Sequence, residues 1–310
     1  MTPAPLDHDL SDGPPGAEAI FLRSSDGVSL RAALWPGAGH GTVFIFPGRT
    51  EFVEKYGRAA GDLARRGYGS ICIDWRGQGA SDRLLPDPMM GHVRRFGDYQ
   101  RDVQAMIGLA YARALPRPWH LLSHSMGGTI ALRSLMRPHP FASAVFSAPM
   151  WGLVMPPPLR AVAWTVSTLA RGVAQAHRLT PTAPAECYLA THGFAGNQLT
   201  TDKTMFDWMK AQVMAHRDLS LGGPSLGWLN AALVECAALA RMRSPDVPAL
   251  TAIGTDETIV ACPPIHTRMA RWRGGRLDVY KGARHEIMME TAPYRQRFFD
   301  AAADWFAGHA

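Results

Sequence analysis

The sequence lacks the features that mark several classes of protein. Its four cysteines form no C-x-x-C pair, which argues against a zinc knuckle or a redox motif. The opening residues, MTPAPLDHDLSDGPPG, do not show the basic and then apolar order of a signal peptide. Residues 138–159 carry no charge, but their repeated prolines would break a membrane-spanning helix. We therefore expect a soluble cytoplasmic protein, and leave peripheral contact with the inner face of the membrane open.

Charge is also scarce. Charged residues make up 19% of the 310 residues, and the formal net charge is +6. The arginines are scattered and form no basic block longer than pairs such as Arg65-Arg66. We therefore do not expect a nucleic-acid partner. Hydrophobic residues make up 47%, which predicts a large core in one α/β domain with an insertion, or in two domains.

Short apolar runs alternate with amphipathic segments over much of the chain. Continuous apolar runs at 42–48, 69–75 and 119–124 predict strands that are buried on both faces. Helical patterns at 51–66 and 96–115 lie between them. Such alternation is typical of a mostly parallel sheet with helices on both faces, which is an α/β fold.

This alternation stops near Met150 and returns near residue 244. Between these points the patterns are mainly helical, and prolines and glycines separate them. We therefore predict an α/β core interrupted by a helical insertion, and a disordered proline-rich tail before it. The predicted parts are the tail at 1–16, the core at 17–149 and 244–310, and the insertion, a helical cap, at 150–243.

The stretch LLSHSMGG places Ser125 between a predicted strand and a predicted helix. Small residues stand two positions before and after it, at Ser123 and Gly127, which is close to the G-x-S-x-G nucleophile elbow. In such an elbow the serine hydroxyl stands above the sheet, and the N–H of Met126 points toward the same place. A serine in an ordinary turn between strand and helix is the alternative.

A serine hydroxyl needs a base, and a histidine base is oriented by an acid. His285 follows the predicted strand RLDVYKG and precedes the last helix, so we expect it above the same edge of the sheet. Two neighbouring residues in GTDETIV could supply the acid. The usual spacing after Gly254 favours Glu257, and Asp256 is the runner-up. His285 lies in HEIMME, which is not H-E-x-x-H, so we expect no metal there.

A second oxyanion donor is expected from the turn in IFPGRTE. Gly48 lets the backbone approach a substrate, and the N–H of Arg49 is the candidate donor. The Arg49 side chain could instead form an ion pair with Glu51. The later motif DWRGQGASD, with Gly77 and Gly79, predicts a structural loop near the site and is too weak to indicate a nucleotide site.

Taken together, these motifs resemble the α/β-hydrolase superfamily and, within it, the lysophospholipase and monoacylglycerol-lipase group of serine hydrolases. The resemblance is carried, in order, by FPGRTEFVEKY, DWRGQGASDR, LLSHSMGG, GTDETIV and GARHEIMME. It implies a mostly parallel eight-stranded sheet with a cap inserted after the sixth strand, and ester hydrolysis without cofactor or metal. Three departures stand out: Ser123 for the first elbow glycine, Pro47 where relatives often carry histidine, and Glu257 where aspartate is commoner.

The resemblance also implies the substrate and its surroundings. We expect a small-molecule lipid ester, bound against apolar side chains of the cap such as Trp151 and Trp228 and against Gly48. Arginines of the first cap helix, including Arg160, suggest peripheral membrane contact. A carboxylesterase for short esters or lactones, and an inactive hydrolase fold used for binding, are the alternatives. Acyl length, headgroup and oligomeric state are left open.

Overall fold

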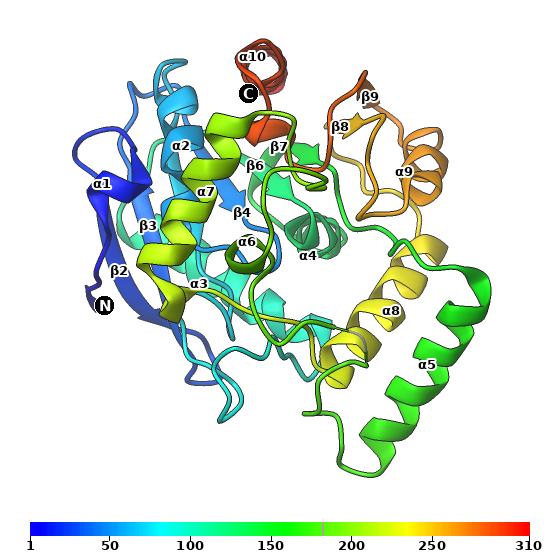
Figure 1. The fold of residues 1–310 in the computed structure, drawn as a ribbon. Helices are drawn as coiled ribbons and strands as arrows, with labels where there is room; N and C mark the ends of the chain where they lie inside the picture. Colours follow the sequence, from blue (N-terminus) through cyan, green and yellow to red (C-terminus); the bar gives the residue numbers. More distant parts are fainter. Residues whose placement is uncertain (182) are drawn as a thin grey trace.

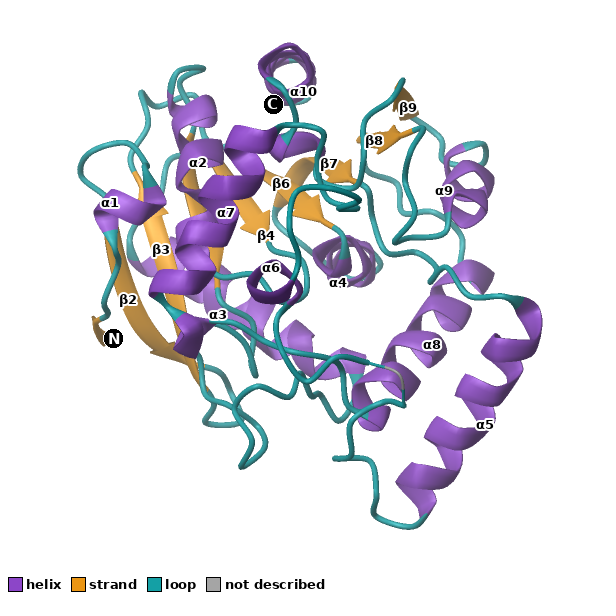
Figure 2. Cartoon of the chain, viewed as in Figure 1, coloured by secondary structure: helices purple, strands orange, loops and turns teal. Residues whose placement is uncertain are grey.

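The computed structural model describes residues 1–181 and 183–310 and is built on one nine-stranded sheet (Figures 1 and 2). The strand order is β1-β2-β3-β5-β4-β6-β7-β8-β9. The first three strands and β5 pair antiparallel, and all pairs from β5 to β9 are parallel. The strands are β1 Thr2–Pro3, β2 Glu18–Arg23, β3 Ser29–Trp35, β4 Thr42–Phe46, β5 Gly69–Ile73, β6 Trp119–His124, β7 Phe141–Ser147, β8 Ala249–Gly254 and β9 Gly275–Tyr280.

Helices cover both faces of this sheet, and each face has its own apolar core. The core beneath α2 and α10 contains Val43, Ile45 and Phe299, and the core beneath α3, α4 and α9 contains Phe44 and Phe46. Alternate residues of β4 therefore point to opposite cores, as the pleat requires. The helices are α1 His8–Ser11, α2 Gly57–Ala64, α3 Tyr99–Ala112, α4 Met126–Leu135, α5 Pro157–Gly172, α6 Tyr188–Thr191, α7 Lys203–Ala215, α8 Leu226–Arg241, α9 Cys262–Met269 and α10 Ala292–Ala307.

The structure therefore has the α/β-hydrolase architecture that the motifs predicted, with one strand more than expected. The additional strand is β1, whose two residues pair with Ile20 and Phe21 of β2 at the edge of the sheet. It lies in residues 1–16, which we expected to be a disordered tail. This segment also forms α1, where Asp7 caps the helix and Ser11 is buried. This segment contacts residues of α7, which are remote from it in sequence. No local pattern within residues 1–16 therefore predicts these contacts.

Four helices, α5 to α8, lie between β7 and β8 in the chain. In Figure 1, α5 and α8 run side by side away from the sheet, whereas α7 lies close to α1. Prolines begin α5, and Gly172 ends it. None of the helices in the described ranges is both long and apolar enough to cross a bilayer.

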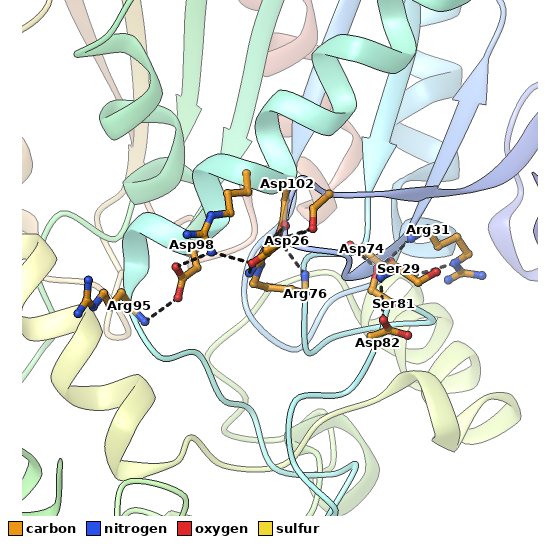
Figure 3. A network of polar contacts seen from close by, with 12 residues as sticks. Asp26, Ser29, Arg31, Asp74, Arg76, Ser81, Asp82, Arg95, Asp98 and Asp102 are labelled. Atoms are coloured by element: carbon orange, nitrogen blue, oxygen red, sulfur yellow. Dashed lines mark hydrogen bonds and ion pairs between the residues drawn. The ribbon is translucent and has the colours of Figure 1, made fainter. Parts of the chain in front are cut away.

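The loop that follows β5 is held by ion pairs as well as by the buried ring of Trp75. Arg31 of β3 and Arg76 of this loop each lie between two carboxylates, and Figure 3 shows those around Arg76 and the Asp74 partner of Arg31. Asp74 accepts from the Arg31 side chain and from the backbone N–H groups of Val53 and Ala80. The motif DWRGQGASD therefore has the structural role that we predicted, and none of its residues lines the cavity described below.

Candidate active site

Ser125 lies in a sharp turn between β6 and α4. Its φ and ψ of 48° and −117° are unfavourable for a residue with a side chain, and such strain is typical of a nucleophile elbow. The turn is held by backbone hydrogen bonds to the end of β7: the Ser125 N–H donates to Ser147, and the Met150 N–H donates to Ser125. Neighbouring strands thus impose a conformation that the residue would not adopt by itself.

The elbow pattern S-x-S-x-G is explained by the space around its two small residues. A Cβ atom at Gly127 would lie 2.0 Å from the carbonyl oxygen of Phe46, so only glycine fits there. Ser123, by contrast, is fully buried in β6 with its side chain accommodated. The close approach of α4 to β4 therefore requires glycine after Ser125 but not before it.

His285 and Glu257 form a buried pair at the carboxyl ends of β8 and β9. His285 Nδ1 lies 2.6 Å from Glu257 Oε2, and the side chains are 4% and 0% exposed. The other Glu257 oxygen accepts the N–H groups of Ile259 and Val260. Burial alone would raise the pKa of Glu257, but the hydrogen bond and the charge of His285 lower it, so Glu257 stays ionised.

Asp256, the other acidic candidate, does not face the histidine. It is exposed, and its carboxylate accepts from the Thr255 hydroxyl. Of the two neighbours, the structure brings only Glu257 to His285.

Ser125 and His285 face one cavity of about 480 Å³, a usual size for a small-molecule site. No hydrogen bond joins their side chains in the described part of the chain, a common state before substrate binds. Among the proposed pocket residues, Trp228 lines the cavity, whereas Trp151 and Gly48 do not. The apolar lining residues are Phe52, Met150, Leu153, Leu189, Leu199, Met209, Val213, Leu221, Ile259 and Val260.

Trp151 packs elsewhere because two other aromatic residues hold it. Its ring stacks on Trp272 and meets Phe146 edge-on, and its N–H donates to Gly128. It therefore supports the back of α4. The sequence shows that Trp151 belongs to the insertion, but it does not show which residues its ring packs against.

Two backbone amides are the candidate oxyanion donors. Met126 is the first residue of α4, and Arg49 follows Gly48 after β4. In the described residues neither amide N–H donates to another protein group. Both are thus available donors beside Ser125, the arrangement that an oxyanion hole requires.

The Arg49 side chain does not pair with Glu51, which was the alternative for that charge. Glu51 instead accepts from the N–H of Gly48, from Lys55 at 2.6 Å and from the Tyr56 hydroxyl at 2.5 Å. The hydrogen bond from Gly48 holds the turn that carries the Arg49 amide.

A buried charged cluster, three of whose four members line the cavity, was not foreseen. We name Glu51, Lys55, His124 and Glu286 the buried network. Lys55 Nζ lies 2.6 Å from a carboxylate oxygen of each glutamate, and His124 Nε2 lies 3.3 Å from Glu286. The His124 ring also lies 4.7 Å from the ring of His285, centroid to centroid. The network thus connects the turn after β4, the end of β6 and the loop after β9.

The charges in the buried network compensate one another. Burial alone would lower the pKa of His124, but Glu286 and Glu51 outweigh burial and raise it. Burial would raise the pKa of Glu286, but His124 and Lys55 hold it well below the usual range. Lys55 thus contacts both carboxylates, and the carboxylates favour the protonated form of His124.

The same atoms could be mistaken for a metal site. One ligand-type atom each from Glu51, His124 and Glu286 lies within 4.8 Å of the others. The Lys55 ammonium, however, already contacts both carboxylates and supplies the positive charge there. The spacing of Glu51 and Lys55, one helical turn apart, was the only sequence signal of the network.

Comparisons with known proteins find similar chains. A family model described as serine aminopeptidase, S33, matches residues 37–292. A lysophospholipase L2 of Escherichia coli K12 is 32% identical, over 86% of this chain and 80% of its own length. A probable lysophospholipase L2 of Haemophilus influenzae is 30% identical, over 82% and 80%.

Solved structures show the same fold at lower identity. A soluble variant of monoglyceride lipase from Saccharomyces cerevisiae has a TM-score of 0.75 at 20% identity, over 96% of this chain and 98% of its own. A thermostable carboxyl esterase from Bacillus coagulans has a TM-score of 0.72 at 13% identity, over 94% and 98%.

Proposed function

Because this chain belongs to the serine aminopeptidase S33 family of α/β-hydrolases, we propose that it is a serine hydrolase with Ser125 as nucleophile. The chain is a lipid ester hydrolase, as its likeness to lysophospholipases over most of its length indicates. Our finer proposal is that it cleaves lysophospholipids or monoacylglycerols through Ser125, His285 and Glu257. The observation that carries it is that Ser125 and His285, whose Nδ1 contacts Glu257, line one largely apolar cavity.

In this proposal each residue has one task. His285 takes the proton of Ser125 as the hydroxyl attacks the ester carbonyl, and Glu257 holds the imidazole in the required orientation. The N–H groups of Arg49 and Met126 stabilise the oxyanion. His285 then protonates the departing alcohol, and water that it activates hydrolyses the acyl-enzyme.

We propose that α5 to α8 form a cap over the cavity. Residues between Pro184 and Trp228 contribute much of its wall, including Leu189, Met209 and Val213, so an acyl chain would lie between cap and core.

The outer face of α5 supports a further part of this proposal, contact with a lipid surface. Five apolar side chains form a stripe at a spacing of three and four residues, and each is between 40% and 66% exposed. Residues 157–173 contain no acidic side chain, which suits an anionic bilayer. Arg160 and Arg171 hydrogen-bond to Leu153 and Asn230 rather than facing the cavity. The α5 stripe consists of Leu159, Val162, Val166, Leu169 and Val173.

A fluorophosphonate probe tests the nucleophile. We expect it to label the wild-type protein and Ser134→Ala, whose serine is buried in α4 against Gln100, but not Ser125→Ala. Hydrolysis of p-nitrophenyl esters should fall by about 10⁴-fold or more in Ser125→Ala, because the three side chains act as a unit. Near-normal turnover in that variant would refute the assignment and favour a binding role.

A substrate panel separates the ester classes. Monoacylglycerol and lysophosphatidylcholine with the same acyl chain should be cleaved faster than p-nitrophenyl acetate, because only they fill the apolar cavity. The reverse order would favour a carboxylesterase for short esters. Cleavage of aminoacyl nitroanilides without ester hydrolysis would contradict the proposed function.

A further inference from the structure

The Arg49 guanidinium forms part of the cavity wall without a carboxylate partner. In the described part of the chain, its side chain makes one hydrogen bond, 2.6 Å long, to the carbonyl oxygen of Gly222. It lies over the ring of Trp228 at 5.2 Å from the centroid. Its Nε is enclosed and has no partner among the described residues. A cation with an unused donor therefore lies in the wall of the cavity that Ser125 also lines.

Other enclosed arginines of this protein show that the arrangement is unusual here. Arg31 and Arg76 are each bound by two carboxylates, which offset the loss of water around the guanidinium; Figure 3 shows the two around Arg76. Arg268 is held by the carbonyl of Leu239 and lies over Trp151, but it does not line the cavity. Only Arg49 combines, within the described residues, a missing carboxylate with an orphan Nε and a place in the cavity wall.

The chemistry of this group points to an oxyanion with several acceptor atoms. A guanidinium is planar and donates in a fork that matches phosphate and carboxylate. Burial lowers the pKa of Arg49 to about 10, so the side chain keeps its charge at neutral pH. An anion entering the cavity would supply the missing countercharge.

The position of Arg49 also sets where that anion lies relative to the ester. Its backbone N–H is the proposed oxyanion donor, and about six covalent bonds separate this nitrogen from the guanidinium carbon. About six bonds also separate the ester carbonyl carbon of a lysophospholipid from its phosphorus. A carbonyl at the Arg49 amide therefore leaves the phosphodiester within reach of the guanidinium of the same residue.

We propose that the Arg49 side chain is the specificity-determining residue that binds the phosphodiester of a lysophospholipid while the same residue's amide binds the ester oxygen. This inference rests on the proposed function. It predicts that the protein prefers lysophospholipids to monoacylglycerols as substrates. It differs from a purely structural role, in which Arg49 only ties Gly222 and Trp228 to the turn after β4.

The first test compares two substrates with the same acyl chain, palmitoyl lysophosphatidylcholine and monopalmitoylglycerol, below their micellar concentrations. Arg49→Gln should lower kcat/KM for the lysophospholipid at least about tenfold more than for the monoacylglycerol, because only the former loses a charge-assisted contact. Arg49→Lys should restore part of this ratio, and the matched control Arg268→Gln should leave the ratio unchanged. An equal loss on both substrates in Arg49→Gln would overturn the inference and leave the structural role.

The second test uses only the wild-type protein, so folding of a variant does not affect it. Hydrolysis of p-nitrophenyl butyrate is inhibited with a hexadecyl ether analogue of lysophosphatidylcholine, with hexadecylglycerol, and with inorganic phosphate. The phospholipid ether should inhibit at least about tenfold more tightly than hexadecylglycerol. Equal inhibition by the two ethers, or by inorganic phosphate alone at the same concentration, would overturn the headgroup assignment.

The two levels of proposal fail in different ways. Absence of ester hydrolysis together with absence of Ser125 labelling would reject the proposed function itself. Ester hydrolysis with a substrate ratio that does not respond to Arg49→Gln would reject only the role of the Arg49 side chain.

Discussion

At the scale of the residue, two adjacent carboxylates after β8 differ in what they contact. Glu257 accepts from His285 and from two backbone N–H groups, whereas Asp256 is exposed beside Thr255. Glu257 can therefore orient the imidazole of His285, whereas the adjacent Asp256 cannot.

This difference predicts the outcome of two isosteric substitutions. Glu257→Gln should lower kcat/KM by about 10³-fold or more, because an amide no longer stabilises the histidine as it takes the proton. Asp256→Asn serves as the matched control and should stay within about threefold of the wild type. Steady-state kinetics on a p-nitrophenyl ester measure both, and the opposite ranking would assign the acid to Asp256.

At the scale of the element, the buried network joins three segments that also carry the proposed site. Glu51 holds the turn after β4, His124 ends β6, and Glu286 follows His285 in the loop after β9. Lys55 bridges the two glutamates. The groups that face His124 are therefore Glu51, Lys55, Glu286 and His285, and its protonation couples to the packing of these segments.

The raised pKa of His124 predicts a loss of stability toward alkaline pH. The folded protein holds this proton more tightly than the unfolded chain, so its contribution is complete below the ordinary value of 6.5. This contribution to the free energy of unfolding is lost as the pH rises through the pKa of His124 in the folded protein, by up to about 1.4 kcal/mol per pH unit.

Urea unfolding at pH 6 and at pH 9 measures this effect. The midpoint of the wild type should fall more between the two pH values than the midpoint of His124→Gln, which has no titrating group at this position. Parallel changes in the two proteins would show that His124 is not protonated in the folded state.

At the scale of the whole molecule, the insertion exposes an apolar face, the α5 stripe. The α5 stripe faces away from α8, and Figure 1 shows α5 at the periphery, away from the sheet. A protein that takes its substrate from a bilayer benefits from such a face, because the site then stays near the lipid.

Sedimentation with vesicles of phosphatidylglycerol and phosphatidylcholine tests this contact. The triple variant Val162→Ser, Leu169→Ser, Val173→Ser should bind at least about tenfold more weakly than the wild type, since each side chain loses apolar burial. Val279→Ser removes an exposed valine of β9 and should bind normally. Unchanged vesicle binding in the triple variant, with a shift from dimer to monomer in solution, would assign the stripe to self-association.

Much of the fold of this protein can be predicted from local patterns in the amino-acid sequence. The buried strands, the long helices and the insertion follow from hydrophobic periodicity and from proline and glycine, which act over a few residues. The elbow around Ser125 and the loop of His285 are predictable because tight turns and strand ends restrict which residues fit, as the clash at Gly127 demonstrates.

Tertiary structure alone decided the contacts between distant segments. The pairing of β1 with β2 and the exclusion of Trp151 from the cavity depend on neighbours remote in sequence. The pairing of Lys55 with Glu286, and the lack of a carboxylate beside Arg49 among the described residues, are of the same kind, because charge pairing between distant segments acts through space and leaves no periodic trace along a chain.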